Sequence, residues 1–171
     1  MRVRSFTEVE KVTIEDATFD VAPIPDGVWR TLRLRGLQAQ RDATRRALID
    51  LRAAGEEPTE ERVAEWVWLD TRYRDEVEAA MRETVAWGIR GHQVAGLEWA
   101  GQEREWMGRH YRTTSDATVA EYADTDLDAG GSLLQALYLK VAEQNSLSPA
   151  SKKNSPPQSP PPAGAGPAPT A

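Results

Sequence analysis

The chain has 171 residues and no cysteine, and its 27 acidic side chains outnumber its 21 basic ones, which gives a net charge of −6. This length suffices for one domain with a buried core, whereas the lack of cysteine excludes disulfides, thiol nucleophiles and cysteine metal sites. The acidic balance disfavours nucleic acid as a partner, because the phosphates of nucleic acid are also negatively charged.

Signals for a membrane or for export are missing from the sequence. No apolar run approaches the roughly 20 residues that span a bilayer, and the start MRVRSFTEVEK lacks the apolar region of a signal peptide. We therefore expect a soluble cytoplasmic protein that binds neither membrane nor nucleic acid. Arginines cluster between residues 30 and 46, but their helical spacing indicates a solvated helix face rather than a nucleic-acid site.

The stretch KVTIEDATFDVAP predicts a short β-hairpin over residues 10–22. Apolar and polar residues alternate on both sides of a polar break, as they do in two half-buried strands. Pro23 and Pro25 prevent further strand pairing because proline lacks a backbone N–H. A helix is predicted to begin near Asp26.

This helix has two apolar arcs when its residues are placed at about 100° intervals. Small side chains on the first arc allow another helix to approach closely. The second arc needs a further partner, either in the same chain or in a neighbouring copy, and we predict that it binds a partner protein. The first arc consists of Val28, Trp29, Leu32, Gly36, Ala39, Ala43 and Ala47, and the second of Leu37, Leu48 and Leu51.

A second helix is predicted after Gly55 and Pro58, with Thr59 as its N-cap and acidic residues in its first turn. It is predicted to run to about Gly88, some 45 Å, with a wide apolar arc that includes Tyr73, Val77 and Met81 and forms core. Trp68 points away from that arc into a charged face. A lone exposed aromatic is often without a role, but aromatics also anchor protein interfaces, so we predict that Trp68 contacts a partner.

Beyond this helix, glycines at positions 88, 91, 96 and 101 end the helical pattern, and HQVAGLEWAGQE indicates short strands or an irregular loop. Ser115 and Ser132 are predicted N-caps of two further helices, the first of which ends at Ala123. The sequence thus predicts a mainly α fold with a small N-terminal β-hairpin, in the α+β class. We assign residues 1–147 to this domain.

Residues 148–171 are rich in proline, alanine and serine and hold eight of the eleven prolines. Such a segment cannot bury enough apolar surface to offset its chain entropy, so we expect it to be disordered. It is either a flexible tether, a peptide ligand of the polyproline type, or an inert tail.

The stretch IRGHQVAGLEWAGQEREWMGRH contains both histidines of the chain and raises the question of a metal or catalytic site. A zinc site favours ligands at set spacing, such as two histidines four residues apart on a helix. His92 and His110 are instead eighteen residues apart, and we interpret them as structural.

Sequence signatures of catalysis are equally lacking. Ser115 and Ser132 are predicted caps, no G-x-S-x-G elbow occurs, and no glycine-rich phosphate loop follows a strand. We therefore expect a non-enzymatic protein that uses neither cofactor nor metal.

The order of these elements resembles the tail assembly chaperones of long-tailed bacteriophages, in their shorter, non-frameshifted form. The resemblance covers most of the chain and consists of weak local patterns. A short hairpin (KVTIEDATFDVAPIP) leads into long helices, and a glycine- and tryptophan-containing segment (GHQVAGLEWAGQE) follows. A capped helix (TTSDATVAEYA), a leucine-rich helix (SLLQALYLKVAEQNSLS) and KKNS before the tail complete the pattern.

The resemblance implies a non-enzymatic protein of the host cytoplasm that binds the tape-measure protein and keeps it soluble. It also implies recruitment of tail-tube protein through an extended form, self-association, and absence from the mature virion. The extended form arises by ribosomal frameshifting in such proteins, and codons for Lys152, Lys153 and Asn154 permit a slippery run at that place. The alternatives are a structural virion component, such as a head–tail connector or adaptor, and an acidic protein that regulates a host factor.

Overall fold

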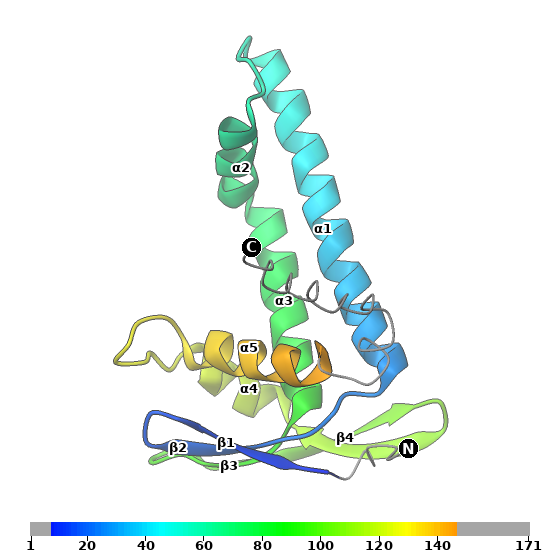
Figure 1. The fold of residues 1–171 in the computed structure, drawn as a ribbon, viewed down its shortest axis with the longest axis vertical. Helices are drawn as coiled ribbons and strands as arrows, with labels where there is room; N and C mark the ends of the chain where they lie inside the picture. Colours follow the sequence, from blue (N-terminus) through cyan, green and yellow to red (C-terminus); the bar gives the residue numbers. More distant parts are fainter. Residues whose placement is uncertain (1–7, 147–171) are drawn as a thin grey trace, which may run out of the picture.

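The computed structural model describes residues 8–146, and Figure 1 shows a helical arm that rises from a base of strands and shorter helices. The tail predicted at 148–171 and the predicted frameshift position at Lys152, Lys153 and Asn154 lie outside the described residues. In chain order the elements are β1 (Glu10–Ile14), β2 (Ala17–Val21), α1 (Asp26–Ala53), α2 (Glu60–Leu69), α3 (Thr71–Gly88), β3 (Ile89–Gln93), β4 (Gly101–Trp106), β5 (Arg109–Thr114), α4 (Asp116–Ala123) and α5 (Leu133–Ser146).

The predicted mainly helical fold with an N-terminal hairpin is confirmed. Strands β1 and β2 pair antiparallel, from Glu10 opposite Val21 to Ile14 opposite Ala17. Strand β3 pairs antiparallel with β2, so β2 is the central strand of a sheet ordered β1-β2-β3. Phe19 of β2 is fully buried and belongs to the hydrophobic core.

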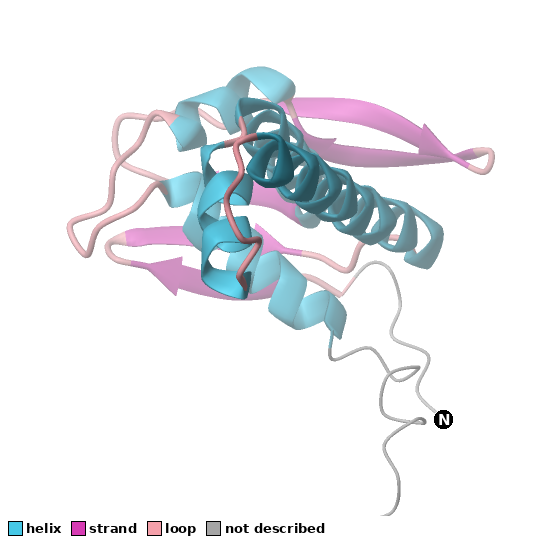
Figure 2. Ribbon diagram, turned by 90° about the horizontal axis from the view of Figure 1, so that it is seen from above, coloured by secondary structure: helices cyan, strands magenta, loops and turns pink. Residues whose placement is uncertain are grey.

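The second sheet is the β4–β5 hairpin, which turns at Met107 and Gly108, both with positive φ. In the view of Figure 2 this hairpin and the β1–β2 hairpin lie on opposite sides of the helices. Trp106 packs so closely on Gly27 that a Cβ on that glycine would lie 2.7 Å from the indole ring. The hairpin is thereby held against the first turn of α1.

The arm consists of α1 packed against α2 and α3. The first predicted arc of α1 does face its neighbours, because Val28, Leu32, Ala43 and Ala47 are buried. Ala43 and Ala47 have no bulk beyond Cβ, so the neighbouring helices approach α1 closely at these positions.

The single helix predicted from Thr59 to Gly88 is wrong, because the chain forms two helices with a break at Asp70. Thr59 does cap α2, where its side chain accepts a hydrogen bond from the Arg62 N–H. Asp70 has an extended backbone (ψ 109°) and its carboxylate accepts from the N–H groups of Arg72 and Tyr73, so it caps α3. An aspartate that bonds its own following backbone competes with helix continuation.

The two remaining helix starts are confirmed. The Ser115 hydroxyl accepts from the Thr118 N–H at 3.2 Å, and the Ser132 hydroxyl accepts from the Gln135 N–H at 3.3 Å. Helix α5 crosses the inner end of α3, where Gly88 leaves room for Val141. The region predicted as strands or loop forms β3, β4 and β5.

A buried side chain fixes the end of α5. Asn145 is 8% exposed, its carbonyl oxygen accepts from the Ile24 N–H at 3.0 Å, and its amide donates to the Val141 carbonyl at 2.7 Å. The last turn of α5 is therefore bonded to the segment that immediately precedes α1.

Substitution of Gly88 tests the contact between α3 and α5. A Cβ at this position would lie 2.4 Å from Cγ1 of the fully buried Val141, so Gly88→Ala is expected to lower the free energy of unfolding by about 1–3 kcal/mol. Gly36 in α1 is the control, because a Cβ there meets nothing within 4 Å. Gly36→Ala is expected to raise stability by roughly 0.5–1 kcal/mol. Urea denaturation measures both, and equal effects would contradict this packing.

Candidate protein-binding groove

The four residues predicted to bind a partner occupy different environments. Trp68 is 69% exposed and Leu37 is 57% exposed, whereas Leu48 is half-buried. Leu51 is fully buried, so its assignment to an accessible surface is corrected. Helix α2 packs beside the outer half of α1, and for this reason the buried face there extends to Leu51.

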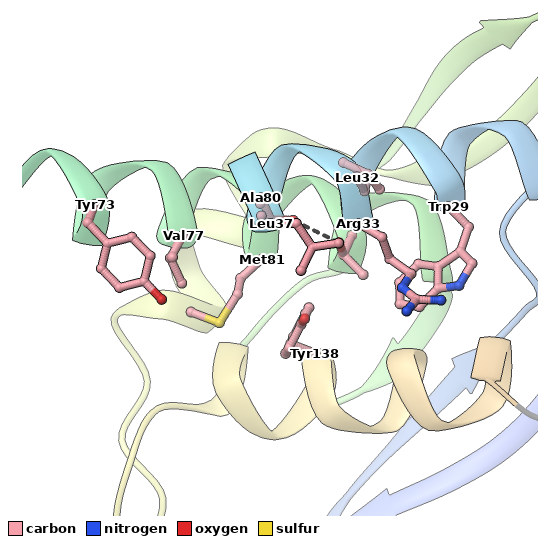
Figure 3. Close-up of a pocket in the computed structure, with 11 residues that line it drawn as sticks. Trp29, Leu32, Arg33, Leu37, Tyr73, Val77, Ala80, Met81 and Tyr138 are labelled. Carbon is pink, nitrogen blue, oxygen red and sulfur yellow. Dashed lines mark hydrogen bonds between the residues drawn. The ribbon is translucent and has the colours of Figure 1, made fainter. Parts of the chain in front are cut away.

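A stripe of three apolar side chains on α3 remains only half-buried. Tyr73, Val77 and Met81 are spaced four residues apart and therefore share one face of the helix. On one side of the stripe is a hollow of about 300 Å³ between α1, α3 and α5. In Figure 3 the stripe and Leu37 of α1 point towards α5, from which Tyr138 points back. The hollow is lined by Trp29, Leu32, Arg33, Gly36, Leu37, Tyr73, Val77, Ala80, Met81, Thr84 and Tyr138.

A second hollow, of about 380 Å³, lies on the other side of the same stripe. Its walls come from Trp68 at the end of α2 and from Leu134 and Gln135 at the start of α5. Both hollows share Tyr73, Val77 and Met81 as a common wall, and we call the two adjoining hollows together the α3 groove. Two predicted residues, Leu37 and Trp68, lie on opposite sides of it.

The other flank of the α1–α3 contact is charged. Arg35 of α1 lies 3.1 Å from a carboxylate oxygen of Glu76 and 3.3 Å from one of Glu83. Glu76 precedes Val77 by one residue, which places it about 100° around α3 from the groove stripe. Exposed ion pairs of this kind add little stability. Their position shows that the charged contacts of the helix pair lie on this flank and the apolar side chains on the groove flank.

Asp70 fixes the geometry of the outer end of the groove. Besides capping α3, its carboxylate lies 2.7 Å from Nη2 of Arg46 on α1. Burial opposes the charged form of Asp70, but hydrogen bonds from Arg46, Tyr73 and Arg72 outweigh it and lower the pKa of this carboxyl below its usual value. The break thus positions Trp68 of α2 beside Tyr73 of α3.

The two histidines predicted to be structural occupy different places. His92 is half-buried, with Nδ1 bonded to the Tyr122 hydroxyl and Nε2 3.2 Å from the Leu97 carbonyl. Because a carbonyl only accepts, Nε2 carries the proton and Nδ1 accepts from Tyr122. Phe19 packs edge-on against both rings. His110 is exposed on β5, opposite Glu105.

The contacts of His92 and Tyr122 are those of core polar groups. Burial raises the pKa of the Tyr122 hydroxyl far above its usual value, and Glu121 adds to the effect. Within residues 8–146, no three histidine, aspartate or glutamate side chains gather in a way that could hold a metal ion.

Sequence reasoning assigned Tyr73, Val77 and Met81 to the core, whereas the structure leaves them lining a groove. The available signal was the width of the apolar arc predicted for this helix. An arc that wide exceeds what one neighbouring helix covers, but the sequence does not show which part stays uncovered.

The chain matches no family model, and comparisons with curated proteins and with solved structures find no significant match. None of the helices in residues 8–146 is long and apolar enough to cross a membrane.

Two substitutions at Asp70 separate its two roles. Asp70→Ala removes the cap and the Arg46 ion pair, and we expect a loss of about 1–2 kcal/mol from the cap alone. Asp70→Ser retains a capping hydroxyl, so it is expected to lose less.

The contribution of Asp70 is expected to depend on pH. Its pKa is lower in the folded chain than in the unfolded one, so the stabilisation is complete above the unfolded value and declines as the pH falls below about 4. Urea denaturation should show the gap between wild type and Asp70→Ser shrinking there. A gap independent of pH would contradict the ion pair.

Proposed function

We propose that this protein is a tail assembly chaperone of a long-tailed bacteriophage, which binds the tape-measure protein and keeps it soluble without enzymatic activity. The observation that carries the proposal is the α3 groove, an apolar and aromatic depression on the arm of an otherwise charged protein. In the same proposal, an extended form recruits tail-tube protein and the protein acts in the host cytoplasm.

The dimensions of the groove suit a helical client. The stripe from Tyr73 to Met81 extends about 12 Å, or two helical turns. An amphipathic helix presents apolar anchors at i, i+3 or i+4, and i+7 over that length, and such a helix lies with its apolar face in a groove. A tape-measure protein is a long helical chain with apolar faces, so successive turns of it offer repeated binding sites.

The rim and the charge of the protein support the same role. Trp68 stands at the rim with 69% of its surface exposed, and tryptophan is a frequent anchor of protein interfaces. Residues 1–146 contain 19 basic and 27 acidic side chains, a net charge of −8. Charge of one sign keeps a protein soluble, which is what a client with exposed apolar faces requires.

A matched pair of substitutions on α1 tests the role of the groove. Leu37 and Leu34 are 57% and 58% exposed, but only Leu37 lines the groove. Burial of a leucine contributes roughly 1.5–3 kcal/mol, so Leu37→Asp is expected to weaken binding of a helical tape-measure segment by about 10- to 100-fold. Leu34→Asp is expected to bind like the wild type.

Isothermal titration calorimetry measures the affinity, and circular dichroism checks that both variants keep native helix content. Equal affinities for the two variants would rule out the groove as the client site. Loss of helix content in Leu37→Asp alone would show instead that Leu37 belongs to the core.

The alternative, a head–tail connector or adaptor, uses the same groove for a permanent virion contact. A chaperone leaves the assembly before it is complete, whereas a connector remains in fixed copy number. Mass spectrometry of purified phage particles is expected to detect the tube and tape-measure proteins and not this chain. Detection at constant stoichiometry would favour the connector.

A further inference from the structure

The chain carries a segment suited to the α3 groove. Residues 156–162 read PPQSPPP, with five prolines in seven positions. We propose that this segment binds in the α3 groove of its own chain and covers it while no other protein is bound. The inference goes beyond the proposed function, because it needs no client and holds for any partner of the groove.

The chemistry of the groove favours a proline-rich occupant. Its walls carry the aromatic rings of Trp29, Tyr73 and Tyr138, with Trp68 at the other side of the stripe. Proline-rich segments dock in aromatic-lined grooves, because their polyproline II form is already extended and loses little entropy on binding. The indole N–H of Trp29 and the tyrosine hydroxyls are donors, which suits a segment whose prolines offer only carbonyl acceptors.

The fold places the origin of this segment beside the groove. Asn145 bonds the last turn of α5 to the N–H of Ile24, and Trp29 lies in the first turns of the helix that follows. The chain therefore leaves α5 near the Trp29 end of the hollow. Tyr138 is eight residues back along α5 from Ser146, a distance of about 12 Å.

The chain length allows the return. Nine residues separate Ser146 from Pro156, and a chain of that length reaches roughly 30 Å when extended. Seven residues of polyproline II span about 22 Å. The part of α3 that lines the groove, from Tyr73 to Thr84, spans about 16 Å. The segment is thus long enough to span the length of the groove.

Tethering favours the same contact, because a short tether supplies an effective concentration in the millimolar range. A contact with an affinity of about 0.1 mM or tighter then covers the groove most of the time.

A spin label tests this contact in the full-length chain. The protein has no cysteine, so Ser159→Cys carries the only nitroxide. The label is expected to remove most of the intensity of the Trp29 indole N–H peak in the NMR spectrum. The Trp99 peak, whose indole bonds to Thr114 in the base, is expected to keep its intensity.

Two controls identify the cause of any broadening. A labelled chain in which Pro156, Pro157, Pro160, Pro161 and Pro162 are replaced by serine keeps the same tether and is expected to restore the Trp29 peak. Replacement of Pro167 and Pro169, outside the segment, is expected to leave the broadening unchanged. Leu37→Asp should also restore the peak, and Leu34→Asp should not.

A mixed sample distinguishes one chain from two. An unlabelled ¹⁵N chain mixed with spin-labelled ¹⁴N chain is expected to show no broadening at Trp29, because the contact is within one chain. Broadening in the mixture would assign the groove to a second copy and overturn the proposal. Equal Trp29 intensity with and without the five prolines would overturn it as well, whatever the client experiment shows.

Discussion

The arrangement of the molecule depends on how α3 is covered along its length. Its inner half is enclosed by the base, and Thr84, Val85, Trp87 and Gly88 are all buried. Its outer half keeps one apolar face half-buried, between α1 on one side and residues of α2 and α5 on the other. The α3 groove follows from this difference, because α5 crosses α3 at its inner end and leaves the face around Tyr73 only half-buried. Because the inner half of α3 is covered more completely than the outer half, a strip of its apolar arc remains available to another partner.

Local signals predicted much of the fold. The hairpin over residues 10–22 and the helix starts at Asp26, Thr59, Ser115 and Ser132 are confirmed, because alternation, side-chain caps and the prolines before Asp26 depend on a few neighbouring residues. The break at Asp70 was not predicted, since the apolar spacing runs through it from α2 into α3. An aspartate inside such a pattern is compatible with both a solvated helix position and a new N-cap.

Non-local contacts account for the remaining differences. The pairing of β3 with β2 joins residues some seventy positions apart, and nothing in the stretch around His92 specifies that partner. Leu51 was predicted to bind a partner because helical spacing does not show whether the same chain or another one covers the second arc, whereas α2 covers that side of α1. Leu37 and Trp68 were predicted to contact a partner; both are exposed and line the groove, and their role in binding stays a prediction. Tyr73 and Met81 were missed because an apolar position does not reveal whether anything covers it.

An uncovered apolar groove promotes unwanted self-association, because two such faces bury each other. A tethered, proline-rich occupant avoids that outcome without closing the groove to a client, since it gives up only a weak contact when displaced. If it covers the groove nine-tenths of the time, a competing client binds about tenfold more weakly than to the open groove. A client with several apolar turns overcomes that factor through repeated contacts, whereas a chance partner with a single short apolar face does not. Occupancy by its own chain would therefore select for long helical clients, and this selectivity would arise from competition rather than from any additional contact.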